Sequence, residues 1–364
     1  MIVKGEKTFK RTIENILIIQ LGDIGDVVWA TPTFKAVKDA YPRAKVAVLL
    51  RSGFGSLLTA DPSVDKVFEV ERYKGTVIEK TRVHWSFIRS LRKEHFDLAF
   101  DLRSDDRGAY MAVLSGAPLR VSIIYNAVRW RNRFFTHLAD PPPLDKTKTT
   151  AAEQSLRVVK AFGIEPADEV PKIYVSKDAA DRARRLCLLE GLSEDRWITV
   201  NPFSRWRYKE WNDDKWAEII DWLWGKHRAS VVMLGSDDER ERSENIARKC
   251  HGHVCNLTGM TTLAELAGVL RHSRLHIGVD SAAPHIAAAV GTPTVTIYGP
   301  SDWRDWAHGG GKHSIILPDD ICVPCGQKGC DGSGNSRCLE NLTVDKVKKA
   351  IQESLYREGL CLEN

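Results

Sequence analysis

Short runs of consecutive apolar residues, each followed by a turn and then by helically spaced apolar positions, constrain the fold of this chain most strongly. The first run covers residues 16–19, and similar strands are expected at 45–50 and 97–101. Fully apolar runs of this length are typical of parallel strands that are buried on both faces. Strands that alternate with helices form parallel sheets covered by helices, so the sequence predicts an α/β protein.

The same pattern resumes after a break at residues 140–143, where three prolines follow Asp140. Prolines in a row fit neither the interior of a helix nor a central strand. Two α/β halves of about 170 residues each lie within the usual size of a domain. We expect domains at 1–170 and 171–343, followed by a closing amphipathic helix within 344–364. Further strands are expected at 197–201, 230–234, 275–279 and 294–298, and helices at 27–41, 84–95, 151–162, 263–270, 283–290 and 344–355.

Composition excludes several classes of protein. Of the 364 residues, 43% are hydrophobic and 28% charged, which are globular values and argue against disorder along most of the chain. The longest apolar runs reach about five residues, far from the roughly 18 needed to cross a bilayer. No secretory signal is recognisable at the N-terminus, so we expect a cytoplasmic protein. The net charge of +5 is too small to predict a nucleic-acid partner.

Polar residues that directly follow predicted strands are candidates for a site, because ligands of open α/β sheets bind beyond the carboxyl ends of the strands. Gly22, Asp23, Gly25 and Asp26 follow the first strand and open a helix. A carboxylate here suits a general base, and Asp26 could accept a proton from a hydroxyl group. Capping of the helix by Asp23 or Asp26 is an equally good interpretation. This stretch is not the glycine pattern of a dinucleotide site.

Three segments of the second half also follow predicted strands. Ser204 and Lys209 could neutralise a diphosphate, although a solvated basic loop explains them as well. The segment from Asp280 begins a helix of small residues, whose free N–H groups could hold a phosphate. An ordinary N-cap by Asp280 or Ser281 explains the start of this helix as well, and His285 could be functional or structural. Glu239 could bind ribose hydroxyls or cap a helix at the surface.

Two further features of the sequence carry alternatives. Cys322, Cys325, Cys330 and Cys338 lie in a glycine-rich loop at residues 322–338. A structural Zn²⁺ site, reduced thiols and local disulfides are all compatible with their spacing. The basic, aromatic stretch at 129–135 could meet anionic lipid head groups or a phosphorylated acceptor, or it could be a solvated surface segment.

Motifs along nearly the whole chain resemble those of glycosyltransferase family 9, the bacterial heptosyltransferases of the lipopolysaccharide inner core. In order, they read GDIGDVVWATPTFKAVKDAYP, FDLAFDLRSDDRGAYMAVLSGAPLRV, NPFSRWRYKEWNDDKWAEI, NLTGMTTLAELAGVL, GVDSAAPHIAAAVGTPTVTIYGPSD and CVPCGQKGC followed by CLENLTVDKV. Each motif is weak alone, and their common order makes the resemblance specific. It implies a GT-B fold, in which two Rossmann-like domains with parallel sheets face each other across a cleft and the last helix packs back on the N-terminal domain.

The resemblance also assigns roles to residues. It implies that Asp26 is the catalytic base, that Lys209 and Ser204 hold the donor diphosphate, and that Glu239 meets the donor ribose. Asp280, Ser281, Ala282 and His285 match the donor-side signature; many relatives have glycine at the position of Ala282, where a methyl group limits how closely the backbone approaches the donor. We expect the acceptor to meet a set of residues in the first half: Gly25, Arg103, Arg107 and Arg120.

The implied activity is the transfer of a heptose, with inversion, from an ADP-sugar to a lipid-linked lipopolysaccharide core acceptor. No cofactor is expected for catalysis, and contact with the cytoplasmic face of the inner membrane would be peripheral. Two alternatives remain open at this point. One is a GT-B glycosyltransferase that uses another nucleotide sugar for a cell-surface glycan. The other is a non-catalytic protein that binds a sugar nucleotide.

Overall fold

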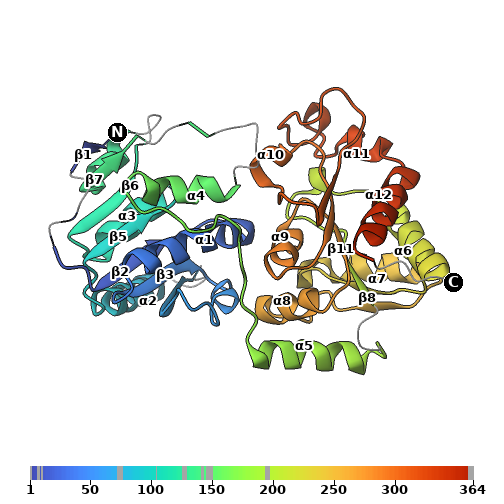
Figure 1. Cartoon of the computed structure of the whole chain (residues 1–364), viewed down its shortest axis with the longest axis horizontal. Coiled ribbons are helices and arrows are strands. Elements are labelled where there is room, and N and C mark those ends of the chain that lie inside the picture. The colour runs from blue at the N-terminus through green and yellow to red at the C-terminus, as the bar shows by residue number, and fades with distance from the viewer. Residues whose placement is uncertain are drawn as a thin grey trace. The chain divides into compact units, whose positions relative to one another are not determined.

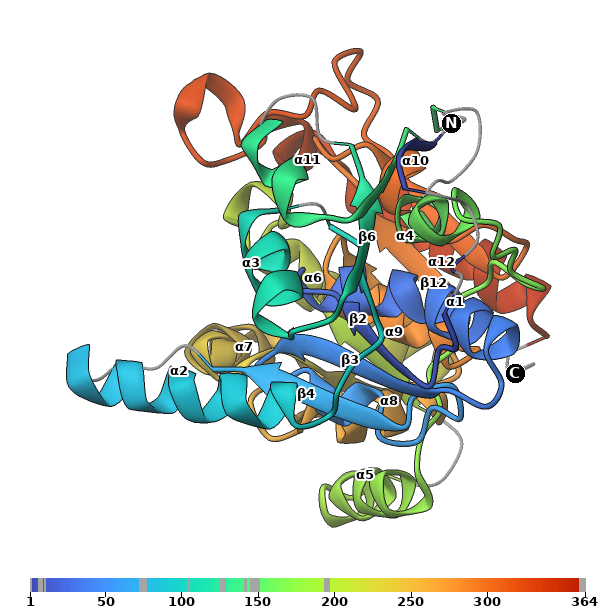
Figure 2. The same ribbon diagram turned by 90° about the vertical axis from the view of Figure 1, so that its left-hand side faces the viewer.

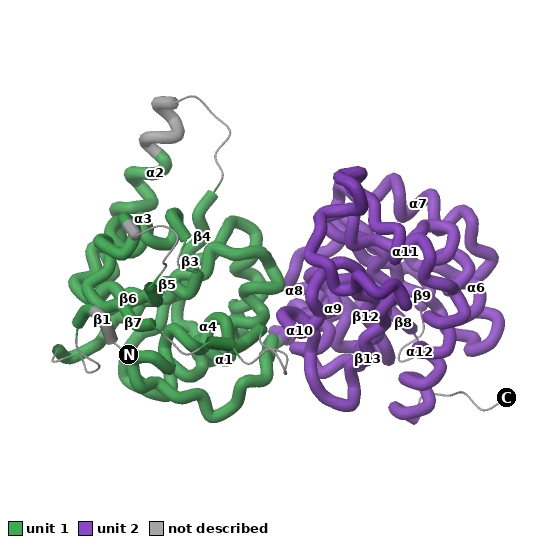
Figure 3. The backbone as a smooth tube through the Cα atoms, turned by 90° about the horizontal axis from the view of Figure 1, so that it is seen from above, with its two compact units in different colours: residues 1–145, 150–174 green, residues 146–149, 175–364 purple. Residues whose placement is uncertain are grey.

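A computed structural model of the chain divides into two compact units, Met1–Asp145 with Thr150–Tyr174 and Lys146–Thr149 with Val175–Asn364 (Figures 1 and 3). The structure describes residues 2–5, 9, 11–71, 77–103, 105–124, 129–140, 143–144, 151–192 and 197–359. Each unit is built around its own sheet, and we describe each by itself.

The first unit contains a seven-stranded sheet with the order β1-β7-β6-β5-β2-β3-β4. All its neighbouring strands run parallel except β1, which pairs antiparallel with β7 at one edge. The central strand β2 is apolar and fully buried from Ile16 to Ile19, as the sequence predicts. The strands are β1 (Ile2–Lys4), β2 (Asn15–Ile19), β3 (Lys45–Arg51), β4 (Lys66–Val70), β5 (Leu98–Asp101), β6 (Leu119–Ile123) and β7 (His137–Ala139).

Helices cover both faces of this sheet. Figure 2 shows α1 and α4 on one face and α2 and α3 on the other. Right-handed crossovers explain this, because the chain adds strands in opposite directions from β2 and the connecting helices then fall on opposite faces. Pro32 lies inside α1 and not in its first turn. The helices are α1 (Ile24–Ala40), α2 (Val77–Arg92), α3 (Asp106–Leu114) and α4 (Ala151–Lys160), with the short 3₁₀ helices η1 (Gly55–Leu57) and η2 (Arg129–Phe134).

The second unit contains a six-stranded sheet with the order β10-β9-β8-β11-β12-β13, and all its pairs are parallel. Its core is a continuous apolar cluster that includes the fully buried Trp216, Val231 and Ile277. The strands are β8 (Trp197–Asn201), β9 (Ser230–Met233), β10 (Val254–Asn256), β11 (His276–Val279), β12 (Thr294–Ile297) and β13 (His313–Ile316).

The last described helix, α12, packs inside the second unit. Its apolar side chains Val347, Ile351 and Leu355 are buried in the core cluster of that unit, and it contacts β12, β13 and α6. The amphipathic stripe of this helix is therefore buried on the sheet of the second unit. The helices of this unit are α5 (Lys177–Leu189), α6 (Asp213–His227), α7 (Arg240–Lys249), α8 (Leu263–Arg271), α9 (Ala282–Ala289), α10 (Trp303–Trp306), α11 (Arg337–Asn341) and α12 (Val344–Arg357), with η3 (Arg207–Lys209), η4 (Asp237–Glu239) and η5 (Cys330–Gly332).

In each sheet, one pair of neighbouring strands marks the point from which the chain adds strands in opposite directions. In the first unit the chain proceeds outward from β2 through β3 in one direction and from β5 through β6 in the other. In the second unit β8 and β11 are the corresponding pair. Helices leave such a pair toward opposite faces, so a crevice opens beyond the carboxyl ends of the two strands, where ligands of α/β sheets bind.

Candidate active site

The first cluster of predicted residues lies at the carboxyl ends of β2 and β5. After β2, the chain turns through Gly22 into α1, and Asp23 is the N-cap residue of that helix. The Gly22 N–H donates to the side-chain oxygen of Gln20 at 3.2 Å, which shapes the turn. Because β5 pairs directly with β2, the residues that follow Asp101 come to the same edge of the sheet.

Asp26 is the third residue of α1 and both caps the helix and faces the residues after β5. Its Oδ2 accepts the Asp23 N–H at 2.7 Å, and the Asp23 side chain completes a capping box. The same oxygen lies 2.7 Å from Nη1 of Arg103. Burial raises the pKa of the Asp26 carboxyl above its ordinary value, although Arg103 and the Asp23 N–H act to lower it. Asp26 therefore forms the helix cap that the sequence allowed, and its role as a base stays a prediction.

Gly22 makes room for this carboxylate. A Cβ atom at Gly22 would lie 2.3 Å from Oδ2 of Asp26, well inside the contact distance of real side chains. The glycine is thus required by the close approach of a side chain, and not by a left-handed backbone, which its conformation does not have. Gly25, an expected acceptor residue, is the second residue of α1 and lies beside Asp26 in the same turn.

The three expected acceptor arginines have different surroundings. Arg103 pairs with Asp26. Arg107, on α3, donates to the Leu21 carbonyl at 3.2 Å and to Asp105 at 2.9 Å, so it lies against the loop that leads to Asp26. Arg120 does not join them, because it is near the start of β6, at the opposite edge of the sheet. Its guanidinium donates to the carbonyls of Phe134 and Ala117, which points to a structural role.

The second cluster lies at the carboxyl ends of β8 and β11 in the other unit. Nζ of Lys209 lies 2.6 Å from Oδ2 of Asp280, and the hydroxyl of Ser204 donates to the Asp280 carbonyl at 3.3 Å. The Asp280 side chain is only 5% exposed, so the lysine supplies the charge that compensates it. Predicted residues from two segments that are far apart in sequence therefore meet at the position that the strand order creates.

The helix α9 begins directly after Asp280. Ser281 is its N-cap residue, with an extended backbone, and Ala282 is its first residue. The Ser281 hydroxyl is buried and has no hydrogen-bond partner among the described residues. A hydroxyl in this state costs free energy until a ligand or water satisfies it. The Ala282 backbone is helical, so the alanine at this position is not strained.

His285 lies on the same helix in a buried pair with His308. Nδ1 of His285 is 3.4 Å from Nε2 of His308, and the His308 ring lies near that of His313, with 5.5 Å between centroids. Burial lowers the pKa of His285 to about 4, so the imidazole is neutral at physiological pH. The sequence pattern singled out His285 and missed His308 and His313. These two come from a different segment of the chain, at the start of β13 and just before it.

Glu239 follows the neighbouring strand β9, in η4. Its Oε2 accepts the Ser236 N–H at 2.6 Å, and burial raises the pKa of its carboxyl. Glu210 is a further residue that the sequence analysis missed. One of its oxygens accepts the Ser204 N–H at 2.9 Å and the other pairs with Arg242 at 2.8 Å, so it anchors the loop that carries Ser204 and Lys209. No local sequence pattern identifies Glu210, because its partner Arg242 lies far along the chain, in α7.

The four clustered cysteines do not form the structural zinc site that their spacing allows. Among the described residues, no group of three or more His, Cys, Asp or Glu side chains is arranged to hold a metal ion. Cys322 and Cys325 are exposed, Cys330 is partly buried and Cys338 is buried. Burial raises the pKa of the Cys338 thiol to about 11.

The basic, aromatic stretch contains η2, which packs on α3. Arg131 is buried and pairs with Asp106 at 3.2 Å, whereas Arg133 is exposed. Trp130 is 42% exposed and lies against Tyr110 of α3, with 6.0 Å between ring centroids. The side chain of Arg129 lies outside the described residues. The stretch thus combines a structural arginine with a partly exposed aromatic pair.

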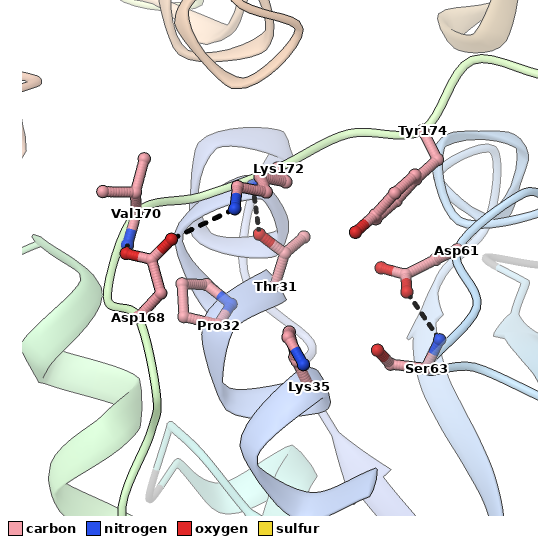
Figure 4. A pocket seen from close by; sticks show the side chains of 9 residues that line it. All are labelled: Thr31, Pro32, Lys35, Asp61, Ser63, Asp168, Val170, Lys172 and Tyr174. Carbon is pink, nitrogen blue, oxygen red and sulfur yellow. Dashed lines mark hydrogen bonds and ion pairs between the residues drawn. The ribbon is translucent and has the colours of Figure 1, made fainter. Parts of the chain in front are cut away.

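A separate pocket lies in the first unit, away from the predicted residues (Figure 4). It is bounded by α1 and by the segment at 168–174, which is tied to that helix by a hydrogen bond of 3.1 Å from the Lys172 N–H to the Thr31 hydroxyl. None of its lining residues was expected to take part in function. They are Thr31, Pro32, Lys35, Asp61, Ser63, Asp168, Val170, Lys172 and Tyr174.

Known proteins are similar to this chain in sequence. The family model of glycosyltransferase family 9 (heptosyltransferase) matches residues 84–334, more than half of the chain. The lipopolysaccharide heptosyltransferase 3 of Escherichia coli (strain K12) is 30% identical over 290 residues, which cover 78% of this chain and 82% of that protein. Asp26 precedes the range that the family model matches. Within the described residues, every helix is too short or too polar to span a bilayer.

Solved structures are similar in fold. A glycosyltransferase family 9 protein from Veillonella parvula has a TM-score of 0.80 and 19% identity, covering 97% of this chain and 100% of that chain. The ADP-heptose lps heptosyltransferase II of E. coli has a TM-score of 0.75 and 21% identity, covering 95% of this chain and 99% of that chain. These likenesses confirm the predicted GT-B class with its two Rossmann-like units. The family model and the 30% identical relative establish that the chain belongs to glycosyltransferase family 9 (heptosyltransferase) and is a glycosyltransferase.

Proposed function

We propose that this glycosyltransferase moves a heptose from ADP-heptose to the inner core of lipopolysaccharide, with inversion at the anomeric carbon. The names of its relatives support the substrates: one is a lipopolysaccharide heptosyltransferase and another an ADP-heptose lps heptosyltransferase. In this proposal the first unit binds the acceptor and the second binds the nucleotide sugar. The observation that carries the proposal is the position of Asp26, a buried carboxylate with a raised pKa at the crevice that the strand order opens.

Asp26 acts as the general base on the acceptor. It removes the proton of the acceptor hydroxyl while the hydroxyl oxygen forms a bond to the anomeric carbon of the heptose. The bond from that carbon to the diphosphate oxygen breaks, and its electron pair leaves with ADP. Attack opposite to the leaving group inverts the anomeric carbon. The products are the glycoside, ADP and a proton, which Asp26 carries until it passes to water.

The second unit meets the charge that develops on the departing diphosphate. Lys209 and Ser204 supply a cation and a hydroxyl, and the N-terminus of α9 presents free N–H groups at Ser281 and Ala282. Lys209 pairs with Asp280, so donor binding would exchange or share that ion pair with phosphate. Glu239 is proposed to bind the donor ribose, and neutral His285 to contribute to donor binding without adding charge. We propose that these groups suffice for the step without a cofactor.

The acceptor side of the proposal uses Gly25 and Arg107, which lie beside the Asp26 loop. Arg107 is 52% exposed at its side chain and can turn toward phosphate groups of a lipid-linked core. Contact with the cytoplasmic face of the inner membrane would then be peripheral. The exposed Arg133 and the Trp130–Tyr110 pair are the groups that we propose for it.

The experiment that tests this function replaces Asp26 by Asn and measures heptose transfer and ADP binding. The amide keeps the size of the side chain and can still accept the Asp23 N–H, so the helix cap is retained. Transfer should fall by about 10²–10⁴-fold, because a base of this kind contributes about that much. Calorimetric binding of ADP should stay within twofold of wild type, since Asp26 belongs to the other unit.

Two outcomes would contradict the proposal. Near-wild-type transfer by the D26N protein would show that Asp26 is not the base. Tighter binding of UDP or GDP than of ADP, in parallel titrations of the wild-type protein, would favour a glycosyltransferase with another nucleotide sugar. A screen of nucleotide sugars against truncated lipopolysaccharide acceptors then identifies the donor.

A further inference from the structure

The two oxygens of the Asp26 carboxylate have unequal surroundings. Oδ2 accepts the Asp23 N–H at 2.7 Å and lies 2.7 Å from Nη1 of Arg103. Within the described part of the chain, Oδ1 has no hydrogen-bond or ion-pair partner. Both groups that hold the carboxylate thus act on one oxygen and leave the other available.

We infer that Arg103 is a positioning residue for the base: with the Asp23 N–H it holds Oδ2, so that Oδ1 is the oxygen that receives the acceptor proton. This inference rests on the proposed role of Asp26. It assigns Arg103 a function different from the acceptor binding that the sequence suggests. It also predicts which part of the side chain faces the acceptor hydroxyl.

The position of Arg103 is itself set by the fold. Its backbone N–H donates to Oδ1 of Asp101 at 3.2 Å, and Asp101 is fully buried at the end of β5. A Cβ atom at Gly108 of α3 would lie 2.3 Å from the same oxygen, so the glycine allows α3 to pack on this carboxylate. The strand pairing of β5 with β2 then directs the Arg103 side chain toward α1.

The other charged groups near Asp26 are paired elsewhere. Asp23 forms an ion pair with Arg51 of β3, although its negative charge still acts to raise the pKa of Asp26. Arg107 donates to Asp105 and to the Leu21 carbonyl, and the structure gives it no contact with Asp26. Arg103 is therefore the described cation that compensates the Asp26 charge directly.

Compensation is needed because Asp26 is largely buried, with a side chain that is 15% exposed. Burial raises the pKa of this carboxyl and Arg103 opposes the rise. Removing the arginine leaves the burial cost unopposed, so the pKa of Asp26 rises further. The protonated acid cannot accept a second proton at Oδ1, and the fraction of active enzyme at neutral pH falls. A guanidinium stays charged throughout, so it exchanges no proton with Asp26.

The test compares the pH dependence of heptose transfer in wild type and the R103Q protein, under single-turnover conditions with saturating donor and acceptor. We expect the acidic limb of the rate profile to move up by about one to three pH units in R103Q. At high pH the rate should recover toward wild type, because Asp26 is then ionised. R103K keeps the positive charge and should move the limb back toward its original position.

R107Q is the matched control, since Arg107 is a neighbouring arginine whose described hydrogen bonds and ion pairs do not include Asp26. Its acidic limb should coincide with that of wild type, whatever the effect on the acceptor KM. The inference is overturned if R103Q raises the acceptor KM more than tenfold while its acidic limb stays in place, because Arg103 would then only bind the acceptor. Activity of the D26N protein in the same assay separates this failure from failure of the proposed function.

Discussion

Replacing Gly22 by Ala tests whether the position of the Asp26 carboxylate, and not only its presence, controls transfer. The new Cβ atom would lie 2.3 Å from Oδ2 of Asp26, 2.6 Å from its Cβ and 2.7 Å from its Cγ. Ordinary contacts begin at 3.4 Å, so the carboxylate must move by about 1.1 Å. The turn must deform as well, because the Cβ of Asp26 is fixed to the backbone of α1. The substitution changes no charge and removes no hydrogen-bonding group, so its effect is steric.

This displacement should lower both the stability of the protein and the rate of transfer. Loss of the hydrogen bond from the Asp23 N–H, together with overpacking, should lower the free energy of unfolding by about 1–3 kcal/mol. For a unit of this size, the melting temperature then falls by roughly 2–4 °C per kcal/mol. A base that is misplaced by about 1 Å loses roughly 10²-fold in rate, so the transfer rate at 25 °C should fall by about that factor.

The control is Gly225, which lies in α6 of the other unit and where an added Cβ atom would meet nothing within 4 Å. Alanine there should stabilise the protein by about 0.5–1 kcal/mol, because glycine is the poorer helix former. The assay measures transfer at saturating substrates and melting by circular dichroism. Our account of the Asp26 position is refuted if G22A keeps both the wild-type transfer rate and the wild-type melting temperature.

Two further predictions concern parts of the molecule outside the catalytic step. Burial lowers the pKa of His276 to about 3, so the unfolded chain takes up a proton below pH 6.5 that the native protein refuses, and stability is lost as the pH falls. Urea unfolding between about pH 5.5 and 4.5 measures how steeply the free energy of unfolding falls with pH. H276Q should lower this pH dependence by about 1.4 kcal/mol per pH unit, and an unchanged pH dependence would contradict the burial argument. Arg120 donates to the carbonyls of Phe134 and Ala117, so R120M should cost about 1–3 kcal/mol of stability and leave the acceptor KM unchanged, whereas a raised KM in a fully stable protein would restore its role in acceptor binding.

Local patterns in the sequence predicted most of the strands that matter for the site. The apolar run at 16–19 became β2, and the runs that start at residues 45 and 197 became β3 and β8. These predictions succeed because a buried parallel strand needs only a short apolar segment between turns. The positions of Asp26 and Asp280 followed from the same argument, since both come directly after such strands. The order of the motifs along the chain also indicated the family, glycosyltransferase family 9.

The contacts of long side chains were predicted less well than the strands. Nothing near Arg103 in the sequence indicates Asp26, because the two are brought together by the pairing of β5 with β2. Arg120 has the same residue type but lies at the opposite end of its strand, and only the register with β5 reveals this. The spacing of the cysteines allowed a zinc site, but among the described residues no cysteine group is arranged to hold a metal ion, because spacing alone does not fix the conformation of a loop.

The amino-acid sequence by itself determined the alternation of strands and helices, the turns that follow the strands, and the acidic and basic residues at those turns. These features depend on neighbours within a few positions, which is why periodicity and turn chemistry are sufficient to read them. Tertiary structure alone decided the strand order, the pairing of Lys209 with Asp280 and the sheet on which α12 is buried. It also decided which carboxylate oxygen of Asp26 pairs with Arg103. Those features depend on contacts between segments far apart in the chain, where packing and the cost of burying charge select one arrangement.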